Sequence, residues 1–386
     1  MSTGRVNDGR ARRPVVQMES YLDWNASAPL RVEAVAAMSE VLIRCGNPSS
    51  VHRRGRAARQ VVERARGAIA ELVGGVDPSG VIFVSGGTEA NHLALRGVTD
   101  RRILISAIEH DSVRAAAPEA TVIPVTSEGV VDLRELEAML AADARPALVS
   151  IMLANNETGA IQPIAEIAAI ARAHGALLHC DAIQGAGKIP VTMRALGADL
   201  MSISAHKLGG PQGVGALVVR EGVTLGALQR GGGQERGRRA GTENLPGIVG
   251  LGAAAEVAAR EGLPSAAIAE LRDAAQAALT SVAPEARVFA KDAPRLPNTL
   301  CIGMPGVAAS TQVMALDLAG VMVSAGAACS SGKVRRSHVL AAMGATPEDA
   351  ESAIRVSLGW STTAADIERL IDAWTALYRR TRSAAA

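Results

Sequence analysis

The chain has 386 residues, with 40 Lys or Arg against 38 Asp or Glu and a formal net charge of +2 at pH 7. This balance argues against a nucleic-acid or membrane-surface protein that binds through a large basic patch. Hydrophobic residues make up 48% of the chain, which excludes general disorder, and aromatic residues make up only 2%, which argues against base-stacking platforms.

The N-terminal 17 residues contain four arginines and little apolar content. We predict a disordered extension over residues 1–17, with a true start at Met18 or a transit peptide as the alternatives. No apolar run reaches the roughly 18 to 20 residues of a membrane span, so no membrane partner is expected.

From residue 50 onward, helical and strand patterns alternate. A helical spacing of apolar residues runs from Ala58 to Val73 and is stopped by Gly74 and Gly75. A second helix is expected from Pro163 to His174. Further expected elements are a helix at 88–95 and strands at 81–84, 103–105, 148–153, 176–179, 200–203 and 215–219. Strands alternating with helices predict an α/β protein with a mostly parallel sheet covered on both faces.

The pattern changes after about residue 265. The expected elements there are helices at 268–279, 347–354 and 364–378 and short strands at 299–302 and 321–324. We therefore predict a large domain over 18–264, whose first residues 18–30 pack with a smaller α/β domain over 265–386.

Each predicted strand of the large domain is followed by a polar cluster. These clusters occupy 85–89, 109–110, 155–157, 181–184 and 204–207. Because ligands of open α/β sheets bind outside the carboxyl ends of the strands, we expect the clusters to converge on one site.

The residues in these clusters suggest the ligand. Gly86, Gly87 and Thr88 lie between a strand and a helix, where free amides and a hydroxyl can hold a phosphate, although this signal alone is weak. Taken singly, Asp181 is better explained as a cap or ion pair and Lys207 as a solvated lysine. Together, at successive strand ends, they fit pyridoxal 5'-phosphate (PLP), which needs a lysine amine and a carboxylate at its pyridinium nitrogen.

Motifs spread over the chain beyond residue 20 make this interpretation specific. They are YLDWNASAP at 21–29, GNPSSVHRRGRAAR at 46–59, FVSGGTEANHLA at 83–94, EHDSV at 109–113, NNETGAIQP at 155–163, DAIQGAGK at 181–188, SISAHKLGGPQGVGAL at 202–217, GGGQERGRRAGTEN at 231–244, SAGAACSSG at 324–332 and IRVSLGWSTT at 354–363. In these motifs the chain resembles cysteine desulfurases of the NifS/IscS kind, within the class V aminotransferases. The resemblance implies PLP fold type I, with a seven-stranded, mostly parallel sheet sandwiched by helices and a smaller C-terminal α/β domain.

The resemblance also assigns roles around the cofactor. It implies that Lys207 holds PLP and moves the substrate α-proton, with Lys188, placed in a loop by its glycines and Pro190, as the nearest rival. Asp181 would pair with the pyridinium nitrogen, and His110 would stack on the ring and take part in proton transfer.

Other polar residues would hold the ring, the phosphate and the substrate. Asn156 and Gln184 would bind the ring hydroxyl or the substrate. The phosphate would be bound by Gly87, Thr88, Ser204 and His206.

Two further roles involve the partner subunit and the substrate. Thr242 would reach the phosphate of the neighbouring subunit, which implies a homodimer with shared sites. Arg355 would bind the substrate carboxylate, a bidentate contact that suits arginine, and its alternative is a surface ion pair.

Cys329 lies among small residues and is the residue that separates desulfurases from ordinary aminotransferases. The resemblance implies that Cys329 takes sulfur from L-cysteine, which leaves alanine and a persulfide on Cys329. The sulfur would then pass to an acceptor protein or an iron–sulfur scaffold protein. The only metal contact expected of Cys329 is ligation of iron–sulfur during this transfer. Its loop is expected over 325–337. For Cys45, Cys180 and Cys301 a small buried hydrophobe is preferred, with Cys45 the least certain. The cysteine spacing predicts no resident metal site and a reducing cytoplasm.

The chain also departs from the family pattern. Lys333, Arg335 and Arg336 follow Cys329 where relatives often carry an acidic residue and a proline, and Trp360 replaces a common arginine. The basic residues either steer an acidic sulfur acceptor or form a solvated charge run. Two other functions stay open: a class V aminotransferase or lyase for another amino acid, and a non-catalytic dimeric scaffold.

Overall fold

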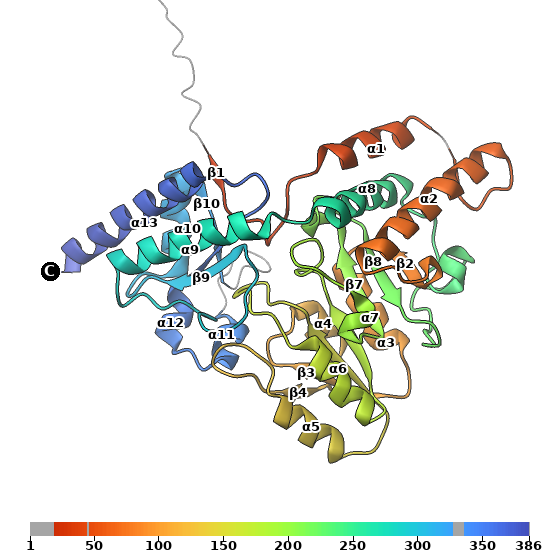
Figure 1. Cartoon of the computed structure of the whole chain (residues 1–386), viewed down its shortest axis with the longest axis horizontal. Coiled ribbons are helices and arrows are strands. Elements are labelled where there is room, and N and C mark those ends of the chain that lie inside the picture. The colour runs from red at the N-terminus through yellow and green to blue at the C-terminus, as the bar shows by residue number, and fades with distance from the viewer. Residues whose placement is uncertain (1–18, 45, 327–335, 386) are drawn as a thin grey trace, which may run out of the picture.

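The computed structural model describes residues 19–44, 46–326 and 336–385, coloured along the chain in Figure 1. The predicted extension at 1–17, together with Cys45, Cys329, Lys333 and Arg335, lies outside the described residues. Among the described helices, none is both long and apolar enough to cross a membrane.

A seven-stranded sheet forms the centre of the larger half. Its order is β2 (Val81–Val84), β8 (Gly215–Val219), β7 (Leu200–Ser204), β6 (Leu177–Asp181), β5 (Ala147–Met152), β3 (Arg102–Ser106) and β4 (Thr121–Ile123). All neighbours pair in parallel except β8, which is antiparallel to both β2 and β7. The predicted fold class, with a mostly parallel seven-stranded sheet, is confirmed. The short edge strand β4 was not predicted because its three residues carry no strong pattern.

Helices cover both faces of this sheet, as Figure 1 shows. One core joins the sheet to α2 (Arg53–Leu72), α5 (Leu133–Ala141), α6 (Ile164–Ala173), α7 (Met193–Leu196) and α8 (Leu245–Glu261). The opposite core joins it to α3 (Gly87–Gly97) and α4 (Asp111–Ala116). Side chains alternate between the two cores: Phe83 enters the first and Ile82 the second. A strand buried on both faces needs this continuous apolar run.

Helix α8 was missed by sequence reasoning, as was α1 (Val32–Leu42), which packs on it. Small residues let α8 approach its neighbours closely: a Cβ added at Gly252 would lie 2.6 Å from the Cβ of Ala65 in α2. Glycines in an apolar stretch lower helix propensity, so tertiary packing forms this helix against the local signal.

A second core lies in the C-terminal part of the chain. It contains the antiparallel sheet β11 (Ser324–Ala325), β12 (Ala353–Ser357) and β9 (Thr299–Gly303), the pair β1 (Ser20–Tyr21) and β10 (Val321–Met322), and the helices α9 (Ser265–Val282), α10 (Ala309–Leu318) and α13 (Ala364–Ala385). Leu22 from the N-terminal segment is fully buried in it. Two short helices, α11 (His338–Ala342) and α12 (Pro347–Ser352), lie beside it.

The prediction of a helix over 347–354 is wrong at its C-terminal end. The helix stops at Ser352, and the chain continues at once as β12, in which Ile354 pairs with Ile302 of β9. All five residues of β12 are buried between neighbouring strands, so tertiary pairing overrides the helical pattern. The strand expected at 321–324 is likewise divided into β10 and β11.

Candidate active site

The carboxyl ends of adjacent parallel strands place two of the predicted site residues. Asp181 is the last residue of β6, and Ser204 ends β7 just before the 3-10 turn that contains Lys207. The loop between β2 and α3 reaches the same edge, where a Cβ added at Gly87 would lie 2.3 Å from Cδ1 of Ile183. A side chain at this position would therefore displace the side chain of Ile183, and glycine lets α3 lie close to the segment after β6.

Asp181 is 4% exposed and lies within a hydrogen-bond network. Its Oδ1 accepts from the amide of Ile183 at 3.0 Å, and its Oδ2 accepts from Nδ2 of Asn91 at 2.8 Å. Nδ2 of Asn91 also donates to Oγ of Ser112 at 2.9 Å, and this hydroxyl lies 2.8 Å from Nδ1 of His110. Asp181 and His110 are therefore connected through Asn91 and Ser112, two residues that lie within the quoted motifs but had no predicted role.

Burial raises the pKa of Asp181, while the Ile183 amide, Asn91, His110 and Lys207 act in the opposite direction. The neighbouring Glu109 is fully buried, and its Oε1 accepts from Oγ of Ser106 at 2.6 Å and the amide of Met152 at 2.9 Å. Burial raises the pKa of Glu109 to about 8, so it carries a proton at neutral pH and adds no second charge beside Asp181.

Lys207 is held by the N-terminal segment. Its Nζ donates to the backbone carbonyls of Asn25 at 2.5 Å and Ala26 at 2.7 Å. A segment nearly two hundred residues away in the chain thus fixes the amine at the sheet edge. Nothing in local sequence spacing indicates this contact.

A cavity of about 350 Å³ lies at the N-terminus of α3, and it is lined by His206, the residue before Lys207. Its lining includes four of the residues predicted to bind phosphate: Gly87, Thr88, Ser204 and His206. Burial, followed by the charge of Lys207, lowers the pKa of His206 to about 4, so its ring is neutral at pH 7. Backbone amides at a helix N-terminus with hydroxyl and imidazole groups form an anion site. With Asp181 and Lys207 adjacent, these residues fit PLP.

Thr242 lines a separate cavity of about 130 Å³, which shares Ser85 and Gly213 with the anion cavity. The side chain of Thr242 is exposed. Within one chain, therefore, Thr242 is not among the residues lining the anion cavity.

The second core contributes Arg355 from β12. It is 4% exposed; its Nη1 donates to the carbonyl of Asn156 at 3.1 Å, and its Nη2 pairs with Oδ1 of Asp23 at 2.7 Å. Its buried Nε has no hydrogen-bond partner among the described residues. An unpaired buried guanidinium donor suits an anionic ligand. Gln184, also buried, donates from Nε2 to the carbonyl of Asn25 at 3.0 Å.

Lys188 lies in a loop, as predicted, but its side chain is buried. The side chain is 7% exposed, and Nζ donates to Oδ1 of Asn25 and Oε1 of Gln184, both at 2.6 Å. The glycines that predicted a loop contain no information on burial, so the sequence named Lys188 as the rival of Lys207 without indicating that it is buried.

The segment that contains Cys329 lies outside the described residues, but Gly326 and Ser337, described residues on either side of it, lie near Glu157. Oε2 of this buried carboxyl accepts from Oγ of Ser337 at 2.5 Å, and a Cβ on Gly326 would lie 3.4 Å from the same oxygen. Burial raises the pKa of Glu157 to about 7. Arg336, the described member of the basic run, pairs with Glu351 at 2.9 Å.

The other described cysteines and Trp360 have structural environments. Cys180 and Cys301 are free and fully buried, as expected for small hydrophobic residues, and burial raises the pKa of both thiols. The ring of Trp360 meets Trp24 edge-on at 4.6 Å, and the guanidinium of Arg31 lies 4.0 Å from its centroid. Trp360 thus joins the N-terminal segment to the second core.

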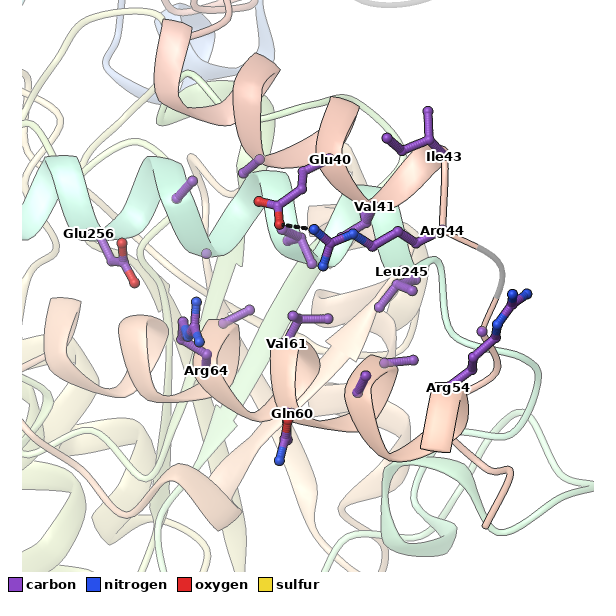
Figure 2. A pocket seen from close by; sticks show the side chains of 18 residues that line it. Glu40, Val41, Ile43, Arg44, Arg54, Gln60, Val61, Arg64, Leu245 and Glu256 are labelled. Atoms are coloured by element: carbon purple, nitrogen blue, oxygen red, sulfur yellow. Dashed lines mark ion pairs between the residues drawn. The ribbon is translucent and has the colours of Figure 1, made fainter. Parts of the chain in front are cut away.

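A larger cavity of about 580 Å³ lies away from these strand ends, between α1, α2 and α8 (Figure 2). Its charged lining residues include the ion pair Glu40–Arg44, at 2.8 Å, and Arg64 and Glu256 (Figure 2). Among the described residues that line it there is no lysine, histidine or cysteine.

Comparison with known proteins identifies the family. The class V aminotransferase family matches residues 20–370. The cysteine desulfurase of Cereibacter sphaeroides is 45% identical over 366 residues, which is 91% of this chain and 94% of that protein. The chain belongs to the cysteine desulfurase family. This confirms the resemblance seen in the sequence motifs.

Solved structures of the cysteine desulfurase family and its neighbours have the same fold. The NifS-like protein from Rickettsia africae superposes with a TM-score of 0.87 at 36% identity, covering 94% of this chain and all of that one. SspA in complex with cysteine has a TM-score of 0.76 at 28% identity, covering 89% of this chain and all of that one. PLP fold type I is therefore the architecture of this cysteine desulfurase family member.

Proposed function

We propose that the chain is a PLP-dependent cysteine desulfurase that converts L-cysteine to L-alanine and retains the sulfur as a persulfide on Cys329. The observation that carries this proposal is the meeting of Asp181, Lys207 and the anion cavity at one sheet edge. Family membership supports the substrate, since the relatives are cysteine desulfurases and a related structure contains cysteine.

Four groups would hold PLP. The anion cavity, with Thr88 and His206, would bind the phosphate, Asp181 the pyridinium nitrogen, and Lys207 the carbonyl carbon. When bound, PLP withdraws electrons from the substrate carbon. Asn91 keeps the Asp181 carboxylate oriented. Because Glu109 is protonated, it adds no negative charge that would disfavour the ionised form of Asp181. His110, fixed through Nδ1 by Ser112, would present Nε2 to the reacting atoms.

The substrate carboxylate would bind at Arg355. Its buried Nε supplies the free donor, and its contact with the carbonyl of Asn156 holds the guanidinium plane. Lys207 would take the α-proton, and Gln184 and Asn156 would supply amide contacts to the ring oxygen or the substrate.

Sulfur transfer requires Cys329 as a thiolate. The thiolate attacks the sulfur of L-cysteine and forms an S–S bond, while the substrate C–S bond breaks with its electron pair going to carbon, which then gains a proton. The products are alanine and a Cys329 persulfide, so no external oxidant is needed. An acceptor protein or an iron–sulfur scaffold would then take the sulfur. The free, buried Cys180 and Cys301 support a reducing compartment.

A homodimer is part of this proposal. Apolar side chains are exposed on and beside α1: Val32, Val35, Leu42, Ile43 and Val51. A second copy would cover them and bring its exposed Thr242 to the anion cavity.

The direct test is a single turnover with L-cysteine. Wild-type enzyme should form one alanine per site and a persulfide on Cys329, detected by thiol alkylation and mass spectrometry. Cys329→Ser should bind cofactor and substrate without forming either product. Retained catalytic alanine formation in Cys329→Ser would contradict the role of Cys329. Keto-acid formation without sulfur transfer would instead favour an aminotransferase, and failure to bind PLP a scaffold.

A further inference from the structure

Lys188 has an unusual environment for a lysine. Its side chain is 7% exposed, and Nζ donates to two amide oxygens, Oδ1 of Asn25 and Oε1 of Gln184, each at 2.6 Å. Among the ion pairs of the described residues, none involves Lys188, although a buried ammonium usually requires a carboxylate.

Composition makes this position more informative. The chain has only four lysines against a large excess of arginine, and two of the four, Lys188 and Lys207, line one small cavity of about 20 Å³. Arginine keeps its charge under all conditions, whereas a buried lysine can lose its proton. At this buried position, lysine therefore differs from arginine in being a compact amine that can gain or lose a proton.

The contacts of Lys188 fix the orientation of two amides. An ammonium only donates, so the oxygens of Asn25 and Gln184 must face Lys188 and their NH₂ groups must face away. Nε2 of Gln184 then donates to the carbonyl of Asn25 at 3.0 Å, the same oxygen that accepts from Lys207. Nδ2 of Asn25 donates to Oγ1 of Thr299 at 2.9 Å.

The two lysines also interact through charge. Two cations act on Lys188, Lys207 on the turn after β7 and Arg355 on β12, and a third, Arg31, lines the same small cavity. The other packed segments present the amides of Asn25, Gln184 and Asn298 and the methyl group of Ala258. Burial lowers the pKa of Lys188 first, and these two cations lower it further. Since repulsion is mutual, a proton on Lys188 disfavours a proton on Lys207.

We propose that Lys188 is a positioning residue of this site: it holds the side-chain oxygens of Gln184 and Asn25, so that the NH₂ group of Gln184 faces the cofactor ring, and it places a second amine beside Lys207. The inference rests on the proposed function and deepens it, because Lys188 acts through Gln184, Asn25 and Lys207 without contacting the reacting atoms.

The test compares Lys188→Met, which keeps the chain length and removes the amine, with wild type and with the exposed control Lys291→Met. Two readouts are used: the pH midpoint of the visible absorption band of the PLP-loaded enzyme, and the PLP dissociation constant from fluorescence. Loss of the repulsion should raise the midpoint by about half a unit or more. Loss of the oriented amide should weaken PLP binding about fivefold. Lys291→Met should match wild type in both.

A double-mutant cycle separates positioning from general damage. In a Gln184→Leu background, Lys188→Met should weaken PLP binding no further, because the amide that Lys188 orients is absent. Additive losses would overturn the positioning role. If Lys188→Met fails to fold, Lys188→Gln, which keeps a donor and removes the charge, should still raise the midpoint.

Wild-type values for both midpoint and affinity in these variants would overturn the inference alone. If wild-type protein showed no band from PLP held at Lys207, the proposed function itself would fail.

Discussion

The backbone carbonyl of Asn25 accepts a hydrogen bond from Nζ of Lys207 at 2.5 Å, across 182 positions of the chain. Three residues earlier, Leu22 is buried in the C-terminal core, and the adjacent Trp24 packs against Trp360. The segment around Asn25 therefore connects the C-terminal core to the lysine at the edge of the large sheet.

Replacement of Asn25 should weaken this connection. Asn25→Leu removes the acceptor for Lys188 and Asn298 and the donor to Thr299, all buried. We expect the free energy of unfolding in urea to fall by about 2–4 kcal/mol, because buried polar groups lose partners. Asn47→Leu, which removes an exposed contact to the amide of Ser49, should cost less than about 1 kcal/mol. Equal losses in the two variants would contradict the central position of Asn25.

Glu109 predicts a pH dependence of stability. Its folded pKa is raised from 4.5 to about 8, so between these pH values the folded protein holds a proton that the unfolded chain has lost. The contribution of Glu109 to the free energy of unfolding is largest below about pH 4.5, falls as the pH rises toward 8, and is constant above pH 8.

Glu109→Gln mimics the protonated carboxyl and should remove that loss. Relative to wild type, the variant should gain up to about 5 kcal/mol in unfolding free energy at pH 8.5 and less than about 1 kcal/mol at pH 5. Glu119→Gln, at an exposed position, should show no such difference. A Glu109→Gln variant whose difference from wild type is the same at both pH values would refute the buried protonated carboxyl.

The contact between Ser337 and Glu157 should anchor the chain just after the Cys329 segment. Oγ of Ser337 donates to Glu157 and accepts from the amide of Leu340, where it caps α11. Ser337→Ala loses both bonds, and we expect a loss of about 2–3 kcal/mol in unfolding free energy. Thr346→Ala removes only the exposed cap of α12 and should cost about 1 kcal/mol. Equal losses of unfolding free energy in Ser337→Ala and Thr346→Ala would show that the contact with Glu157 adds nothing to stability.

The shared-site homodimer can be tested by complementation. Thr242→Asp should repel the phosphate in the partner subunit, and Lys207→Ala removes the amine from its own site. Mixed dimers of the two variants contain one site with Lys207 from one chain and an unchanged Thr242 from the other. Desulfuration should therefore reappear after subunit exchange, at up to a quarter of wild type for random pairing. No recovery in verified mixed dimers would place Thr242 in its own chain's site.

Local pattern allowed the prediction of the sheet and the residues at its strand ends. Apolar runs such as 81–84 are buried on both faces, and the polar residues that follow them, such as Asp181 and Lys207, can only lie at the sheet edge. The contacts to Asn91, Asn25 and Lys188 were not predictable, because they join residues 90 or more positions apart or depend on the burial of a loop.

The central claim is that Lys207, and not its buried neighbour Lys188, holds the cofactor. Borohydride reduction of the PLP-loaded enzyme, followed by peptide mass spectrometry, tests this directly. We expect the reduced cofactor on the peptide containing Lys207, and no labelled peptide from Lys207→Ala. Label on Lys188 in the wild-type enzyme would contradict the account.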